Sequence, residues 1–378
     1  MTSNTPHIHP QTADAFSLSA EAIREKFNAA RQLGKRAKDA AESLGLSEGQ
    51  AVAAHCGEHS YPPKAVPLRG SWVELLQALA LCGPLLALTR NESTVHEKTG
   101  VYQKISAMGP GGRMGLALGD DIDLRLFFDQ WHAGFAVTEL AANPQNRPSI
   151  SLQFFDASGK AVHKIFQRDA TDRDAFADVV AHYTDPACGY VFRRAEAKPV
   201  PLADASIDAA ALVKAWTGMK DTHDFFGLLK THNVERQQSF RLTEGQFTQR
   251  LATTALGDLL VEAAFDGVPI MVFVGSPGCI QIHTGPVKRI EPMNIRGVQW
   301  LNIIDPGFNL HLREDSIASI WHVEKPTSDG VVTSIEAFDH DGELMAMFFG
   351  ARKPGKPERE DWRALAGKLP HLAETLAA

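Results

Sequence analysis

The stretch FDHDG, residues 338–342, has a counterpart in FDASG, residues 155–159. Each follows an apolar run and combines aspartate with glycine, as is typical of a β-hairpin turn. Four further pairs of landmarks keep a similar spacing, 183 to 186 positions: Trp72–Leu76 with Leu256–Leu260, Gly83 with Gly267, Thr99–Gly100 with Thr284–Gly285, and Asp123–Arg125 with Asn309–His311. Because independent landmarks keep nearly one offset, the sequence predicts a tandem duplication.

The first copy reads as helices followed by a meander of strands. Helices are expected from Glu21 to Ala40, after caps at Ser47 and Ser71, and over residues 173–183. Short apolar runs separated by Asn, Gly, Pro or Asp predict strands at residues 85–89, 94–96, 100–105, 113–118, 123–127, 135–140, 150–155 and 161–166. We therefore predict an α+β fold with two similar halves, each with a large antiparallel sheet and flanking helices.

The duplication and the composition together divide the chain into four segments. Residues 1–17 are polar, contain two prolines and predict a flexible tail. Residues 18–183 form the first half. Residues 184–212 hold three prolines and several alanines, which suits a connector, and residues 213–378 form the second half.

Composition limits the possible classes of function. The chain has 44% hydrophobic and 22% charged residues, as in soluble globular proteins, and its net charge of −7 argues against nucleic-acid binding. No apolar run approaches the ~20 residues that cross a bilayer, so an integral membrane protein is not expected. The N-terminus lacks the features of a secretory signal, and the four cysteines are widely spaced. We therefore expect a cytoplasmic protein with reduced thiols.

One feature occurs in only one copy, within residues 216–236, WTGMKDTHDFFGLLKTHNVER. Asp221 or Thr222 can cap a helix whose first turn contains His223, where the helix dipole disfavours a charged ring. A neutral imidazole is the form that binds metals, although an amphipathic helix with an incidental histidine also explains the pattern. The duplication places Lys35 opposite His223, so the first half has no ligand there and His223 is a candidate for a specialised role.

Several basic residues lie in or at the ends of predicted strands. The alternation in DLRLFF, residues 123–128, directs Arg125 away from the core, while Lys325 and Arg352 end strands. Solvated edge positions explain each of them. Together with Phe349 they could instead form a pocket that is half apolar and half cationic, which suits a flat apolar ligand with acidic ends.

Several short motifs occur along the chain in a fixed order, within a region from about residue 20 to residue 365. In order, they are TRNE (89–92), VHE (95–97), GVY (100–102), DLRLF (123–127) with Trp131, THDFFGLLK (222–230), DPGFNLHLRED (305–315), KPTSDG (325–330) and FGARKPG (349–355). With the duplication included, they resemble the HemS/ChuS/PhuS family of cytoplasmic haem-binding and haem-degrading proteins of bacteria.

The resemblance implies one haem in a cleft between two similar halves. His223 would ligate the iron, as a neutral imidazole does, and Arg125 would reach the other side of the haem as the catalytic group. The residues that match the positions around the propionates and the porphyrin edge are Arg236, Lys325 and Arg352. The family has a tyrosine near the position of Phe349. A phenylalanine there removes one hydroxyl donor and leaves aromatic stacking intact.

The resemblance also implies a cytoplasmic role in a bacterial haem-uptake system. The protein would degrade haem to release iron, deliver haem to a haem oxygenase, or do both. Its partners would be haem and either an oxygenase or an inner-membrane haem transporter. The alternative is a non-enzymatic duplicated scaffold, which binds a protein or another small acidic ligand.

Overall fold

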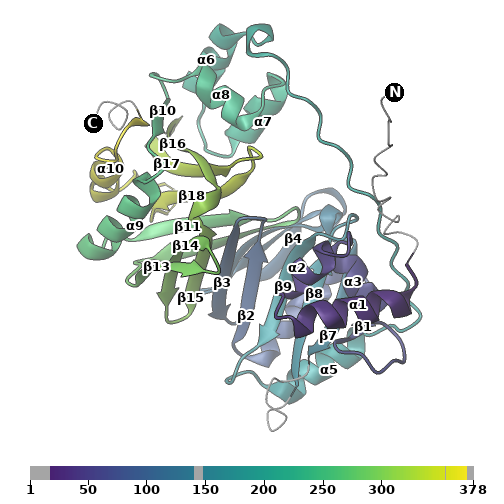
Figure 1. The fold of residues 1–378 in the computed structure, drawn as a ribbon. Helices are drawn as coiled ribbons and strands as arrows, with labels where there is room; N and C mark the ends of the chain where they lie inside the picture. Colours follow the sequence, from purple (N-terminus) through teal and green to yellow (C-terminus); the bar gives the residue numbers. More distant parts are fainter. Residues whose placement is uncertain (1–17, 140–147, 354, 373–378) are drawn as a thin grey trace, which may run out of the picture.

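The computed structural model describes residues 18–139, 148–353 and 355–372 (Figure 1). The predicted tail, residues 1–17, lies outside this described part. The helices are α1 (Ala20–Gln32), α2 (Ala37–Glu42), α3 (Glu48–Ala54), α4 (Trp72–Ala78), α5 (Arg173–Tyr183), α6 (Ala209–Thr217), α7 (Asp224–Thr231), α8 (Arg236–Leu242), α9 (Ala255–Asp266) and α10 (Glu360–Ala366). The strands of the first copy are β1 (Lys64–Pro67), β2 (Leu85–Arg90), β3 (Thr94–Gly100), β4 (Ile105–Met108), β5 (Met114–Leu118), β6 (Asp123–Phe127), β7 (Ala133–Glu139), β8 (Ser149–Phe155) and β9 (Ala161–Gln167). Those of the second copy are β10 (Thr248–Leu251), β11 (Ile270–Gly275), β12 (Cys279–Gly285), β13 (Ile290–Ile295), β14 (Val298–Asp305), β15 (Phe308–Arg313), β16 (Ile317–Thr327), β17 (Gly330–Asp339) and β18 (Leu344–Gly350).

Two antiparallel sheets draw strands from both copies. The first sheet has the order β1-β7-β8-β9-β2-β3-β15-β14-β13, and the second sheet has the order β10-β16-β17-β18-β11-β12-β6-β5-β4. The meander β4–β6 of the first copy therefore extends the second sheet, while β13–β15 extends the first. The two joins are equivalent, since Arg125 of β6 pairs with Ile280 of β12 and His311 of β15 pairs with Val95 of β3. Figure 1 shows β3 and β15 side by side.

The predicted α+β class and tandem duplication are confirmed, because corresponding strands occupy corresponding places in the two sheets. The exchange of the meanders was not predicted. It also explains one wrong strand, which was expected over residues 100–105. Residues 101–104 connect β3 of the first sheet to β4 of the second sheet, so the strand cannot continue across them.

Two helix predictions need correction. The helix expected from Glu21 to Ala40 is divided into α1 and α2, because Gly34 between them has a positive φ of 80° that a helix cannot accommodate. Ser47 caps α3 with a capping box, as its sequence predicts. Ser71 does not cap α4: its φ of 99° leaves its side chain without a capping hydrogen bond.

Helices cover the two faces of the second sheet unequally. On one face, α9 and α10 form a core with the sheet through Leu256, Leu260 and Trp362. On the other face, α6–α8 pack against β16 and β17 at one end of the sheet, through Phe240 and Trp321 among others. We call α6–α8, residues 209–242, the helical cap; it lies at the top of Figure 1. Within the described ranges, no helix has the length and hydropathy needed to cross a membrane.

Candidate functional site

The part of the second sheet that the helical cap leaves uncovered carries Arg125 and Phe349 on one face. Paired positions share a face, as do residues two apart on a strand. Phe349 pairs with Met271 and Ile280 pairs with Arg125, and the β11–β12 register places Met271 and Ile280 on the same side. We call this surface the platform; its residues include Met114, Arg125, Phe127, Phe273, Ile280 and Phe349.

The residues named for the platform are apolar except for Arg125. The rings of Phe273 and Phe349 lie 5.0 Å apart in an edge-to-face arrangement. Arg125 is partly exposed and forms an ion pair with Asp123, while its neighbours Leu124 and Leu126 are buried in the opposite direction. The outward orientation of Arg125 that the alternation predicted is therefore confirmed.

His223 is the N-cap residue of α7, and 90% of its side chain is exposed. Its Nδ1 atom lies 2.5 Å from Oδ1 of Asp221, and its backbone N–H donates to the same oxygen over 2.8 Å. An ionised carboxylate only accepts, so Nδ1 carries the hydrogen, and in the neutral ring the lone pair of Nε2 is available. Asp221 therefore orients the ring and does not cap α7, which begins at Asp224.

The loop that carries His223 is fixed to neighbouring turns. Ser328 donates from its backbone N–H and its hydroxyl to the Lys220 carbonyl, over 2.9 and 3.2 Å. Hydrogen bonds from His223 lower the pKa of Asp221, and the positive charge of Arg352 adds to this shift. Arg352 also lies 3.9 Å from Asp329, at the end of the turn that holds Ser328. The structure thus brings Arg352 close to the His223 loop.

Arg236 and Lys325 converge on a buried carboxylate, Glu336. Arg236 donates to both of its oxygens over 2.7 and 2.9 Å, and Lys325 Nζ lies 3.0 Å from Oε1. Burial acts to raise the pKa of Glu336, but the charges of Arg236 and Lys325 outweigh it and lower the pKa to about 2. Burial also lowers the pKa of Lys325.

This arrangement restricts what the two cations can do. Lys325 is buried and engaged, so it must leave Glu336 to reach a ligand carboxylate, whereas Arg236 is partly exposed. Sequence reasoning missed Glu336. Its position in the alternating strand β17, on the face opposite Ile335 and Ala337, was the available signal. That Arg236 and Lys325 hold propionates stays a prediction.

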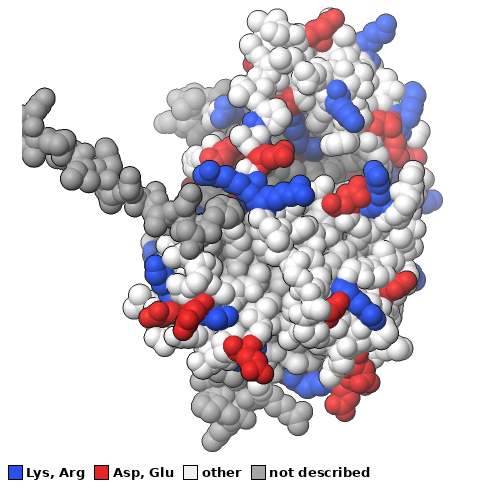
Figure 2. All heavy atoms as spheres, turned by 90° about the vertical axis from the view of Figure 1, so that its right-hand side faces the viewer, with Lys and Arg blue, Asp and Glu red and all other residues white. Residues whose placement is uncertain are grey.

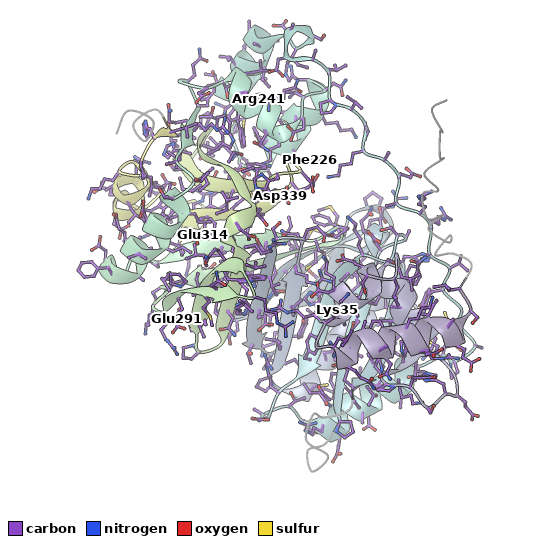
Figure 3. All side chains as sticks on the ribbon, viewed as in Figure 1. Lys35, Phe226, Arg241, Glu291, Glu314 and Asp339 are labelled. Carbon is purple, nitrogen blue, oxygen red and sulfur yellow. The ribbon has the colours of Figure 1, made fainter. Side chains whose placement is uncertain are left out.

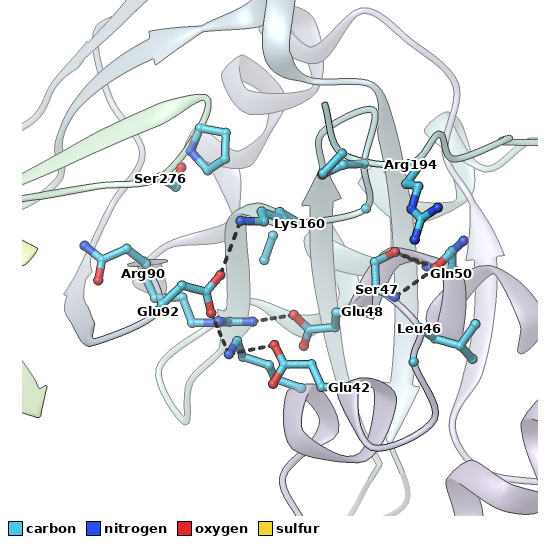
Figure 4. Close-up of a pocket in the computed structure, with 18 of the residues that line it drawn as sticks. Glu42, Leu46, Ser47, Glu48, Gln50, Arg90, Glu92, Lys160, Arg194 and Ser276 are labelled. Carbon is cyan, nitrogen blue, oxygen red and sulfur yellow. Dashed lines mark hydrogen bonds and ion pairs between the residues drawn. The ribbon is translucent and has the colours of Figure 1, made fainter. Parts of the chain in front are cut away.

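A cavity of about 1350 Å³ lies elsewhere, between α2, α3 and turns of both copies (Figure 4). None of the six predicted site residues lines it. Several of its charged side chains are already paired: Arg90 lies 2.5 Å from Glu48, and Lys38 lies 2.8 Å from Glu42 and 2.7 Å from Glu92. Part of its polar wall is therefore neutralised by its own ion pairs.

Surface charge and metal-ligating side chains limit which ligands the protein can bind. On the face shown in Figure 2, basic and acidic side chains lie close together, without one extended area of a single sign. Among the described residues, no three His, Cys, Asp or Glu side chains are placed to hold a metal ion. A metal at His223 would therefore have to bring other ligands with it.

Comparison with known proteins places these features in context. The model of the haemin-degrading HemS/ChuX domain matches the chain twice, over residues 45–183 and 233–369. The haemin transport protein HmuS of Yersinia pestis is 36% identical over 339 residues, which cover 89% of this chain and 93% of that protein. The haemin transport protein HemS of Yersinia enterocolitica is 35% identical over the same shares of both chains.

Solved structures agree with this sequence similarity. Holo-PhuS, a haem-binding protein from Pseudomonas aeruginosa, is 44% identical with a TM-score of 0.87, over 94% of this chain and 100% of that chain. The haem-degrading enzyme ChuS of Escherichia coli O157:H7 is 35% identical with a TM-score of 0.83, over 93% of this chain and 99% of that chain.

Proposed function

The chain belongs to the haemin-degrading HemS/ChuX domain family, and we propose that it binds haem between His223 and the platform. The observation that carries this proposal is the arrangement of His223: its ring is exposed, Asp221 fixes its tautomer, and Nε2 is available. Haem brings four nitrogen ligands to its iron, so one imidazole is sufficient protein ligation. This fits a site without a cluster of three metal-ligating side chains among the described residues.

The platform supplies the complementary chemistry. Phe273 and Phe349 present apolar surface to a porphyrin, and Arg352 lies near the His223 loop, where it can pair with a propionate. Arg125 is a cation on the same face of the sheet as Phe349, where it can donate hydrogen bonds on the side of the haem opposite His223. Phe349 can stack but cannot donate a hydrogen bond.

We further propose a cytoplasmic role in haem uptake, in which the protein degrades haem to release iron, delivers haem to an oxygenase, or does both. The relatives named as haemin transport proteins and as a haem-degrading enzyme support both activities. Haem itself supplies the iron at which oxygen or peroxide would be activated, and Arg125 would position and polarise the oxygen species. Partners would be a haem oxygenase or an inner-membrane haem transporter.

Titration with hemin tests the binding proposal. The wild-type protein should give a saturable Soret change at one equivalent, and His223→Ala should weaken binding at least tenfold and shift the Soret band. His232→Ala is the matched control, because His232 follows the other end of the same helix. A flat wild-type titration would favour a scaffold without metal chemistry, and unchanged binding by His223→Ala would remove His223 as the ligand.

A second experiment separates degradation from delivery. The haem complex is supplied with oxygen and a reductant, or with peroxide, in the wild-type protein and in Arg125→Ala. Loss of the Soret band with release of iron, slowed by Arg125→Ala, supports catalysis. Stable haem that moves to an added haem oxygenase supports delivery.

A further inference from the structure

The two exchanged meanders are equivalent by register, but their hairpins carry different residues at equivalent positions. In the hairpin β13–β14, Met293 pairs with Trp300. In the hairpin β4–β5, Met108 pairs with Met114. The third strands of the two meanders give the same correspondence. Trp300 pairs with Arg313, the last residue of β15, and Met114 pairs with Phe127, the last residue of β6. Met114 therefore occupies the place that Trp300 has in the other copy.

Two short helices, α2 and α7, hold equivalent places in the two copies. Arg36 is the N-cap residue of α2, and His223 is the N-cap residue of α7, the second helix of each copy. By its place as N-cap residue, Arg36 corresponds to His223; it directly follows Lys35, which the sequence alignment sets opposite His223. Figure 3 labels Lys35 in the first half and Phe226, one turn after His223, in the helical cap.

In one copy, the space between hairpin and helix is closed. The guanidinium of Arg36 lies 5.4 Å from the centre of the Trp300 ring, a cation–π contact. Arg296, in the turn of the same hairpin, donates to the Gly34 carbonyl over 3.4 Å. The hairpin β13–β14 thus rests on the start of α2 and fills this space with its own side chains.

In the other copy, the equivalent space is open. Met108 and Met114 are 42% and 47% exposed, and His223 is nearly fully exposed. Within the described part of the chain, no hydrogen bond, ion pair or ring contact joins residues 105–118 to α7. Met114 shares the platform with Arg125, because its partner Phe127 lies two residues further along β6. The open space therefore adjoins the platform.

We propose that Met108 and Met114 form an apolar wall of the haem site, facing His223 across the space that Trp300 and Arg36 fill in the other copy. This inference rests on the proposed function. Thioether side chains are polarisable and adapt their shape, which suits contact with a flat aromatic macrocycle. The closed copy has neither this space nor a histidine at the start of its helix, so the equivalent position there does not form a second site of the same kind.

Two substitutions with a matched control test this wall. Met108→Glu places a charge against the porphyrin, and Met114→Trp fills the space with the side chain of the closed copy. We expect each to weaken hemin binding about tenfold or more. Met293→Glu is the control, because Met293 is the register counterpart of Met108, is 41% exposed and lies in the closed hairpin. It should leave hemin affinity unchanged.

The outcomes separate this inference from the proposed function. Circular dichroism first confirms that the variants fold, as expected for substitutions at exposed positions. If His223→Ala weakens binding while Met108→Glu and Met114→Trp bind hemin with wild-type affinity, the wall is refuted and the haem site stands. Equal loss of affinity in Met108→Glu and Met293→Glu also refutes it. If the wild-type protein binds no hemin, the proposed function itself fails.

Discussion

Replacing Glu336 by glutamine should destabilise the protein by about 3 kcal/mol. Glu336 is buried and accepts hydrogen bonds from Arg236 and Lys325. Removing one partner of a buried ion pair leaves an uncompensated charge, which typically costs about 3–5 kcal/mol. The pKa gives a similar magnitude: a fall from 4.5 to about 2 corresponds to about 3 kcal/mol of stabilisation of the ionised form.

The same shift fixes a pH dependence. The folded-state pKa of Glu336 lies below its unfolded value, so its contribution is fully present above pH 4.5 and is lost as the pH falls from there towards 2. The Glu336→Gln variant lacks this contribution at every pH. The difference in stability between wild type and variant should therefore shrink as the pH falls below 4.5.

Urea unfolding followed by tryptophan fluorescence measures the effect, because Trp216 and Trp321 lie in the core of the helical cap beside this network. Glu343→Gln is the control: its ion pair with Lys198 is largely exposed, so the change should stay within about 0.5 kcal/mol. A loss below 1 kcal/mol for Glu336→Gln, or an equal loss for Glu343→Gln, would refute the role given to the buried network.

Three further predictions concern acid stability, the proximal hydrogen bond and the helical cap. Burial lowers the pKa of His163 and of His283 from 6.5 to about 3. Their contribution to the free energy of unfolding is therefore present above pH 6.5 and should be lost progressively below it, which urea unfolding between pH 7.5 and 5 can measure. Asp221→Asn removes the charged acceptor of the Nδ1 hydrogen, so the ligand becomes less basic; we expect a lower Fe–His stretching frequency in resonance Raman spectra, and an unchanged frequency would contradict this role. Phe240→Ala removes a buried ring that contacts four other aromatic rings, so it should cost about 3–5 kcal/mol in urea unfolding and weaken hemin binding through displacement of α7; stability within 1 kcal/mol of wild type would contradict this packing.

Local patterns in the sequence were sufficient for much of the fold. The alternation around Arg125 predicted both its strand and its outward direction, and Ser47 marked the start of α3. Predictions failed where the backbone took an unusual conformation. Ser71 has the composition of a cap but a positive φ, and Gly34 divides a segment with good helix formers. The connection over residues 101–104 reads as a strand, yet it passes from one sheet to the other.

The candidate site divides in the same way. His223 was distinguishable because the duplication gives no second histidine at its position, and Arg125, Phe349 and Arg352 were named from strand positions and family resemblance. The partners that control their chemistry were not visible. Glu336 is distant in sequence from Arg236, and only the packing of α8 on β17 brings them together.

By itself, the sequence determined the two copies, their α+β class and a histidine, His223, that has no counterpart in the first copy. These features are carried by periodicity, composition and repeated landmarks, which are local or can be compared along the chain. Tertiary structure alone decided that the meanders change places and that one hairpin closes through Arg36 and Trp300 while the other leaves Met114 apart from His223. The physical reason is that a strand encodes its own shape in its residues, whereas its neighbour in a sheet is chosen by long-range packing.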